Sequence, residues 1–146
     1  MSTAGQTRTL TGRRLAYLFK HAERLMSELH VEALAPFDIH ARDLGVLLAI
    51  DSTEPASQQE IAQRMGVDRT TMVAIIDALE AKGMIARHPD PEDRRRNVVE
   101  LTPTGQDILR QAITASDAAE AQLLAPLSLD ESQQLRDLLA RVLARS

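Results

Sequence analysis

Three consecutive arginines, Arg94, Arg95 and Arg96, follow Asp93 in a polar stretch that holds two prolines and several charges. A guanidinium is a permanent cation with donors in a fixed fork, so arginine suits contacts with phosphates and with the electronegative minor groove of DNA. We predict that these arginines lie at an exposed hairpin tip and contact DNA, with Asp93 holding one of them through a bidentate pair. The alternative is a solvated charged turn, which is common at hairpin tips.

A second group of candidates shares the outer face of a helix that we expect from about residue 68 to residue 82. Its inner face carries an apolar stripe at helical spacing. Most of the outer side chains are short, so the helix can enter a major groove, where Arg69 would reach guanine or phosphate. An ordinary amphipathic helix with a polar outer face would show the same pattern. The candidate contacts are Asp68, Arg69, Thr70, Thr71, Val73, Ala74 and Asp77.

The elements around these candidates follow the order of a winged helix-turn-helix. Ser57 and Glu60 form a capping box that starts one helix, and Gly66 permits a tight turn before the next. Two β-prone runs, residues 84–88 and 97–101, then form a ribbon that carries the arginines at its tip. This layout places one helix in a major groove and a ribbon beside it. Further candidate contacts are Ser57 and Gln58 in the first helix and Arg87 in the ribbon.

Helices also flank this module. An apolar stripe with helical spacing runs from about residue 11 to Pro36. A second helix, from about Asp38 or His40 to Ile50, is apolar nearly all round, so it should be central and buried. Pro103 opens a helix after the ribbon, and Ser128 starts a last helix with a capping box. That last helix should bury Leu135, Leu138, Leu139, Val142 and Leu143.

The predicted fold class is mainly α (α+β), with about six helices and a small wing of two or three strands in a single domain of residues 1–146. Residues 38–101 form the winged helix-turn-helix module, and residues 11–36 and 102–145 form dimerisation helices. The apolar stripes of the flanking helices exceed what a small three-helix core can cover, so a second copy would bury them. The alternative is that they pack on their own chain, as part of them must.

Composition excludes several classes of protein. The net charge of −4 argues against indiscriminate nucleic-acid binding, because phosphate contacts supply most of the non-specific affinity. The absence of cysteine excludes disulfides, thiolate metal sites and sensing by cysteine oxidation. The first residues lack the apolar core of a signal peptide, and the longest apolar run is too short to span a bilayer. We therefore expect a cytoplasmic protein without membrane association.

Neither a metal site nor an enzyme is expected. The four histidines are scattered, without the spacing of zinc ligands. The chain has no glycine-rich phosphate loop, no nucleophile elbow and no pair of acids with an evident catalytic purpose.

Several phrases of the sequence match one known family: the helix pair of residues 57–83, LEAKGMI at residues 79–85, DPEDRRR at residues 90–96 and LTPTG at residues 101–105. With flanking helices in the expected order, the whole chain resembles the MarR family of multiple-antibiotic-resistance regulators. The resemblance implies a homodimeric, ligand-responsive repressor on a pseudo-palindromic double-stranded DNA operator, with a small-molecule effector (a phenolic or aromatic compound, for example) and no cofactor. The family's Asp-x-Arg motif maps onto Asp93 and Arg95, which leaves open which arginine enters the groove.

The resemblance also suggests where an effector binds. Tyr17, His21, His40 and Arg42 are polar or aromatic residues near the junction of the dimerisation helices and the winged module. The alternative for each is an ordinary surface or interfacial residue. Without cysteine the peroxide- and thiol-sensing branches are excluded, and the urate-responding branch is less similar because a tryptophan expected in its N-terminal region is absent.

One alternative function from another class stays open. The negative net charge also suits a homodimeric helical interaction protein that keeps the winged fold without binding DNA. Titration with DNA from upstream of its own gene at moderate salt separates the two.

Overall fold

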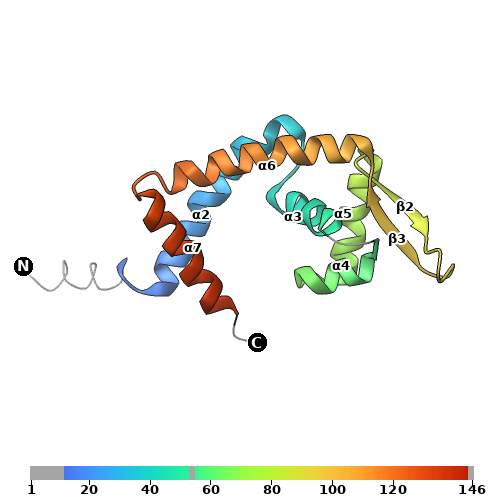
Figure 1. Cartoon of the computed structure of the whole chain (residues 1–146), viewed down its shortest axis with the longest axis horizontal. Helices are drawn as coiled ribbons and strands as arrows, with labels where there is room; N and C mark the ends of the chain where they lie inside the picture. Colours follow the sequence, from blue (N-terminus) through green and yellow to red (C-terminus); the bar gives the residue numbers. More distant parts are fainter. Residues whose placement is uncertain (1–11, 53–54, 145–146) are drawn as a thin grey trace, which may run out of the picture. The chain divides into compact units, whose positions relative to one another are not determined.

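The computed structural model describes residues 12–52 and 55–144. Within these residues the chain forms six helices and a three-stranded antiparallel sheet, which confirms the predicted fold class. None of the described helices is both long and apolar enough to cross a bilayer. In chain order the elements are α2 (Leu15–Leu34), the 3-10 turn η1 (Ala35–Phe37), α3 (Ala41–Asp51), β1 (Ala56–Ser57), α4 (Gln58–Met65), α5 (Arg69–Ala81), β2 (Ile85–Pro89), β3 (Asn97–Leu101), α6 (Pro103–Leu123) and α7 (Leu129–Leu143) (Figure 1).

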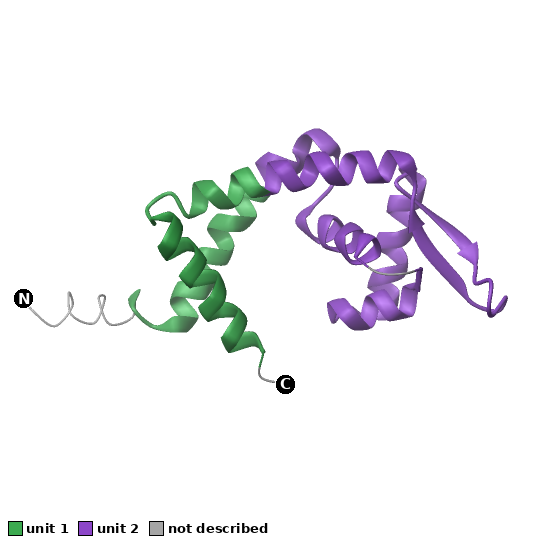
Figure 2. Ribbon diagram, viewed as in Figure 1, with its two compact units in different colours: residues 1–30, 117–146 green, residues 31–116 purple. Residues whose placement is uncertain are grey.

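The chain divides into two compact units (Figure 2). Unit 1 comprises residues 1–30 and 117–146, and unit 2 comprises residues 31–116. Helices α2 and α6 contribute residues to both units. The predicted starting point of the first helix, residue 11, and the predicted end of the last dimerisation helix, residue 145, lie outside the described residues.

Unit 2 contains the main hydrophobic core. Helix α3 is central, as predicted, because Leu47 and its neighbours are buried, although Leu48 on the same helix is 42% exposed. Helix α5 turns an apolar face inward, and the sheet covers the core from another side. The largest fully buried side chains all belong to this unit: Leu34, Val46, Leu47, Ile61, Met72, Ile76, Leu79, Ile85 and Val99.

Local capping signals set the ends of the two helices that follow β1. The Ser57 hydroxyl accepts the Glu60 N–H at 3.2 Å, and the Glu60 carboxylate accepts the Ser57 N–H at 3.3 Å, so the predicted capping box is confirmed. Gly66 ends α4 with φ of 64° and Gly83 follows α5 with φ of 75°, conformations that favour glycine. The helix pair is therefore specified by short-range chemistry.

The sheet forms the wing beside this helix pair. Its strand order is β1-β3-β2, and β2 and β3 form a hairpin in which Arg87 lies opposite Val99 and Pro89 opposite Asn97. The two-residue β1 pairs with β3 immediately before α4 begins. The sheet thus connects the base of the wing directly to the first turn of α4.

A second junction fixes the wing at the end of α5. Thr102 donates its hydroxyl to the Gly83 carbonyl at 2.6 Å and its N–H to the Met84 carbonyl at 3.0 Å. Gly105, in the first turn of α6, lies so close that an added Cβ would overlap the Met84 carbonyl oxygen. Glycine is required there by the close approach of two backbones.

Unit 1 lacks such a core. The expected burial of the last helix is not seen within the single chain: α7 has no buried residue, and Leu139 is only half-buried. Helix α2 buries only Leu34 and exposes apolar side chains such as Leu15 and Leu25. The exposed apolar side chains of unit 1 are Leu15, Tyr17, Leu18, Phe19, Leu25, Leu127, Leu129, Leu135, Leu138, Val142 and Leu143.

Candidate nucleic-acid interface

The outer face of α5 is open to solvent. Arg69, Thr70, Ala74 and Asp77 are exposed, and Met72 lies on the buried inner face. Thr71 and Val73 are half-buried at the edges of the outer face. The outer face therefore carries short side chains with a single arginine at its N-terminal end.

Asp68 caps the N-terminus of α5. Its carboxylate accepts the backbone N–H of Thr71 at 2.7 Å. That hydrogen bond, together with one from the Thr71 hydroxyl, holds the pKa of Asp68 below its ordinary value of 3.8. Asp68 therefore serves the helix itself, and its negative charge persists at neutral pH.

The wing tip is a turn organised by Asp93. Its carboxylate accepts the backbone N–H of Arg95 at 3.1 Å, and its carbonyl accepts the N–H of Arg96 at 3.0 Å. Among the described residues the Asp93 carboxylate forms no bidentate pair with an arginine, and it accepts the Arg95 N–H instead. The Arg96 carbonyl in turn accepts the Asp90 N–H at 2.7 Å and closes the loop.

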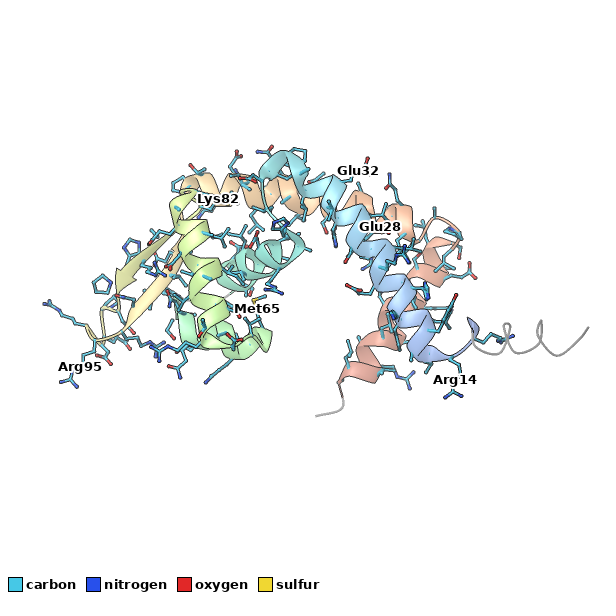
Figure 3. All side chains as sticks on the ribbon, turned by 180° about the vertical axis from the view of Figure 1, so that it is seen from behind. Arg14, Glu28, Glu32, Met65, Lys82 and Arg95 are labelled. Carbon is cyan, nitrogen blue, oxygen red and sulfur yellow. The ribbon has the colours of Figure 1, made fainter. Side chains whose placement is uncertain are left out.

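The three consecutive arginines have different environments. Arg94 and Arg95 are exposed, and neither side chain forms a hydrogen bond or ion pair with the part of the chain that the structure describes. Arg95 projects from the end of the hairpin (Figure 3). Arg96 instead pairs with Glu60 of α4, and its Nε lies 3.5 Å from a carboxylate oxygen of Asp90.

Arg87, in β2, is also bound within the protein. Its Nε donates to Gln58 at 2.7 Å, one terminal nitrogen to Glu80 at 2.8 Å and the other to Asp77 at 2.5 Å. Burial alone would lower the pKa of Arg87, but the hydrogen bond to Asp77 and the charges of Glu80 and Asp77 outweigh it and raise the pKa above its ordinary value. Two of the predicted contacts, Arg87 and Asp77, therefore bind each other.

A cleft of about 720 Å³ lies between the wing and the N-terminal ends of α4 and α5. It brings together six of the predicted contacts: Ser57, Gln58, Arg69, Val73, Arg95 and Arg96. The sequence analysis missed three polar residues that also line the cleft: Gln59, Gln63 and Asn97. The glutamines are four residues apart and so share a helix face, and Asn97 directly follows the arginines. Amide side chains of this kind commonly bind phosphates and base edges.

The four effector candidates fall into two pairs. Tyr17 and His21 belong to unit 1, where their rings are 4.1 Å apart and tilted by 39°. His40 and Arg42 belong to unit 2. His40 caps α3 and donates its backbone N–H to Asp43 at 2.8 Å.

Among the described residues, no group of three or more histidine, aspartate or glutamate side chains is placed to hold a metal ion.

Comparison with known proteins identifies several that are similar to this chain. A protein-family model described as "MarR family" matches residues 37–96. A putative transcriptional regulatory protein for the hcr operon of Thauera aromatica is 36% identical over 98 residues, which are 67% of this chain and 59% of that protein. The chain thus covers about three fifths of the length of the curated relatives that it matches.

Solved structures match over most of the chain. Wild-type MarR of E. coli is 30% identical, with a TM-score of 0.78 over 89% of this chain and 97% of that one. The transcriptional repressor CouR, bound to a 23-mer DNA duplex, is 31% identical, with a TM-score of 0.84 over 90% and 93%. A second structure of CouR, from Rhodococcus jostii RHA1 and bound to p-coumaroyl-CoA, is 25% identical, with a TM-score of 0.80 over 92% and 95%.

The family model covers the helix pair and the wing tip, and the solved structures extend the match through the flanking helices. This chain belongs to the MarR family.

Proposed function

We propose that this chain is a sequence-specific double-stranded DNA-binding transcription regulator that acts as a homodimer. One observation carries the proposal: in unit 2 the open face of α5 borders a cleft that Arg95 also lines, and the side chains of Arg94 and Arg95 have no partner among the described residues. The DNA-bound structure of the similar repressor CouR supports this assignment.

In this proposal α5 enters the major groove. Its short outer side chains allow close approach, and Arg69 and Thr70 at its N-terminal end are placed to meet bases or phosphates. Arg94 and Arg95 then contact the adjacent backbone or the minor groove. Other predicted contacts on α4 and α5 would fix the register of the helix on the duplex.

The negative net charge fits specific rather than indiscriminate binding. Near the proposed interface Arg87 neutralises part of the charge of Asp77 and Glu80, and Arg96 does so for Glu60. Few uncompensated cations then remain for general attraction to phosphates. Affinity would depend on the fit of α5 and the wing tip to a particular sequence.

Homodimerisation would occupy the exposed apolar faces of unit 1. Leu138 and Val142, one helical turn apart on α7, are each 55% exposed, and Phe19 on α2 is 49% exposed. Apolar faces of this kind mark an interaction surface, and closed two-fold pairing is the commonest solution. We propose that residues 11–36 and 102–145 dimerise and that residues 38–101 read DNA.

We further propose repression that a small aromatic or phenolic effector relieves. The structure of CouR with p-coumaroyl-CoA supports an effector of this chemical class. Tyr17, His21, His40 and Arg42 remain the predicted contacts. Adding aromatic acids and their coenzyme A thioesters to the preformed DNA complex tests this step, with release of labelled DNA as the expected result and unchanged binding throughout the series as the contradicting one.

Fluorescence anisotropy with duplex DNA from upstream of the protein's own gene tests the DNA-binding proposal. At moderate salt we expect saturable binding that unrelated competitor DNA does not displace. Replacing Arg94 and Arg95 together by alanine should weaken binding and flatten its salt dependence, because fewer counterions are released. Unchanged binding by the double variant would contradict the role of the wing tip.

The net charge of −4 also supports one competing function, a homodimeric interaction protein that retains the winged fold without binding DNA. The same titration separates the two. Only the competing function predicts that no sequence is preferred over competitor DNA while the protein still dimerises.

A further inference from the structure

We propose that Arg87 and Arg96 are positioning residues that fasten the wing to the first turn of α4, and that they leave DNA contact to Arg94 and Arg95. The inference deepens the proposed DNA-binding function and rests on it. Of the four arginines in this hairpin, two attach the wing to the helices, and the other two contact DNA from the place where the attached wing holds them.

Arg87 is held by acceptors on two helices. Its guanidinium binds Gln58 of α4 and both Asp77 and Glu80 of α5, and its side chain is only 23% exposed. The donors of a guanidinium form a rigid planar fork, so three acceptors in different directions fix both its position and its orientation. A DNA phosphate would have to displace a carboxylate to reach it.

Arg96 is held at the other end of the hairpin. It pairs with one carboxylate oxygen of Glu60, while the other oxygen of Glu60 accepts the Ser57 N–H in the capping box. A single carboxylate thus joins the cap of α4 to the wing. Asp90, whose side chain is 18% exposed, lies 3.5 Å from the Arg96 Nε on the opposite side of the loop.

The two attachments converge on one short segment. Gln58 and Glu60 are two residues apart in the first turn of α4, whereas Arg87 lies within β2 and Arg96 immediately precedes β3. Both strands of the hairpin are therefore tied to the helix-turn-helix by charge-assisted hydrogen bonds. The wing tip cannot move relative to α5 without breaking them, so Arg94 and Arg95 would be held in place before DNA arrives.

Four matched substitutions test the division, because each removes one positive charge from the same hairpin. Arg87→Ala, Arg94→Ala, Arg95→Ala and Arg96→Ala are compared by measuring DNA affinity over a series of salt concentrations. A lost phosphate contact lowers the slope of log K against log salt by about 0.9. We expect lower slopes for Arg94→Ala and Arg95→Ala. Arg87→Ala and Arg96→Ala should lose about tenfold or more in affinity with the wild-type slope, and an equal loss of slope in these two variants would overturn the proposal.

Lysine substitutions provide a second readout, because they keep the charge and remove the fork. Lysine keeps the positive charge that releases counterions, so Arg94→Lys and Arg95→Lys should retain more of the wild-type salt slope than the alanine variants, even where affinity falls. Arg87→Lys and Arg96→Lys should resemble the alanine variants at the same positions. Full rescue of both by lysine would contradict a positioning role.

Hydrogen exchange of the DNA-free protein gives a readout that does not depend on binding. Amides of residues 85–101 should exchange about tenfold faster in Arg87→Ala and Arg96→Ala than in wild type, and at the wild-type rate in Arg94→Ala and Arg95→Ala. Equal protection of these amides in all four alanine variants would overturn the proposal that Arg87 and Arg96 attach the wing. If Arg87→Ala fails to fold, Gln58→Ala removes only the acceptor on α4 and is used in its place.

These readouts keep the two proposals apart. If wild-type protein prefers no DNA sequence, the proposed function fails, and hydrogen exchange still decides whether Arg87 and Arg96 hold the wing. If DNA binds specifically and exchange is equal in all four variants, only the positioning role fails.

Discussion

The two compact units differ in how much of their apolar side-chain surface is buried within the single chain. Unit 2 buries large side chains such as Ile61 and Ile76 completely, and its helices are closed by caps and by the sheet. Unit 1 leaves Leu138 and Val142 more than half exposed and has no buried residue on α7. Helices of similar amphipathic pattern thus have different surroundings in the described residues, and the proposed dimerisation through unit 1 rests on this difference.

The largest expected effect comes from charging the exposed face of unit 1. Leu138→Glu with Val142→Glu places two carboxylates on one face of α7, and we expect dimers to dissociate because carboxylates are not buried unpaired. Sedimentation equilibrium should show twice the 16.1 kDa chain mass for wild type and the single mass for the variant. Leu48→Glu, at an exposed leucine of unit 2, is the control and should remain dimeric. A monomeric wild type, or a dimeric double variant, would contradict the comparison.

Truncating the core of unit 2 should have the next largest effect. Ile76→Ala should lower the free energy of unfolding by about 2–5 kcal/mol, because the side chain is fully buried and leaves a cavity. Leu143→Ala, at an 81% exposed residue of unit 1, should stay within about 0.5 kcal/mol in the monomeric background. Urea unfolding measures both changes. Similar losses at the two positions would show that the units do not differ in this way.

Two glycines within unit 2 sharpen the comparison. Gly105→Ala should destabilise the protein by about 1–3 kcal/mol, because the new Cβ overlaps the rigid Met84 backbone. Gly45→Ala, within helix α3, is the matched control. There the new Cβ meets only the flexible end of the Met65 side chain, at 3.2 Å. Alanine favours helix over glycine by roughly 1 kcal/mol, so thermal unfolding of Gly45→Ala should be unchanged or shifted upward. Equal destabilisation by both substitutions would show that close backbone approach is not the cause.

The smallest expected effect is on the pH dependence of stability, to which one helix cap in each unit contributes. Hydrogen bonds from the N–H groups of Thr71 and Ser128 lower the pKa of Asp68 and of Glu131, whose ordinary values are 3.8 and 4.5. Each carboxylate therefore adds stability that is fully present above its ordinary pKa and is lost as the pH falls through its lowered value. Asp68→Asn and Glu131→Gln keep an acceptor that does not titrate, so each should flatten the acid side of the stability curve. A curve that stays the same in both variants would contradict these pKa shifts.

Sequence patterns predicted the features that short-range chemistry determines. The capping box of Ser57 and Glu60 and the turn at Gly66 each depend on residues within a few positions, and the structure confirms them. The two hairpin strands were predicted for the same reason, because β-prone runs flank an evident turn, whereas β1 was not predicted.

Features that depend on distant residues were not predictable. Arg96 and Glu60 are 36 residues apart, and Arg87 and Gln58 are 29 apart, so no local pattern distinguishes the arginines that pair from those that remain exposed. The expected burial on α7 depended on which surface covers the helix. An amphipathic pattern shows that a face is apolar and does not identify what covers it.

Selection of binding sites from a pool of random duplex DNA tests the central claim most directly, because it examines pairing by unit 1 and reading by unit 2 in one measurement. The account predicts enrichment of an inverted repeat whose half-site centres lie about 10 bp apart, one turn of the double helix. Enrichment of isolated half-sites, or no enriched sequence, would contradict it.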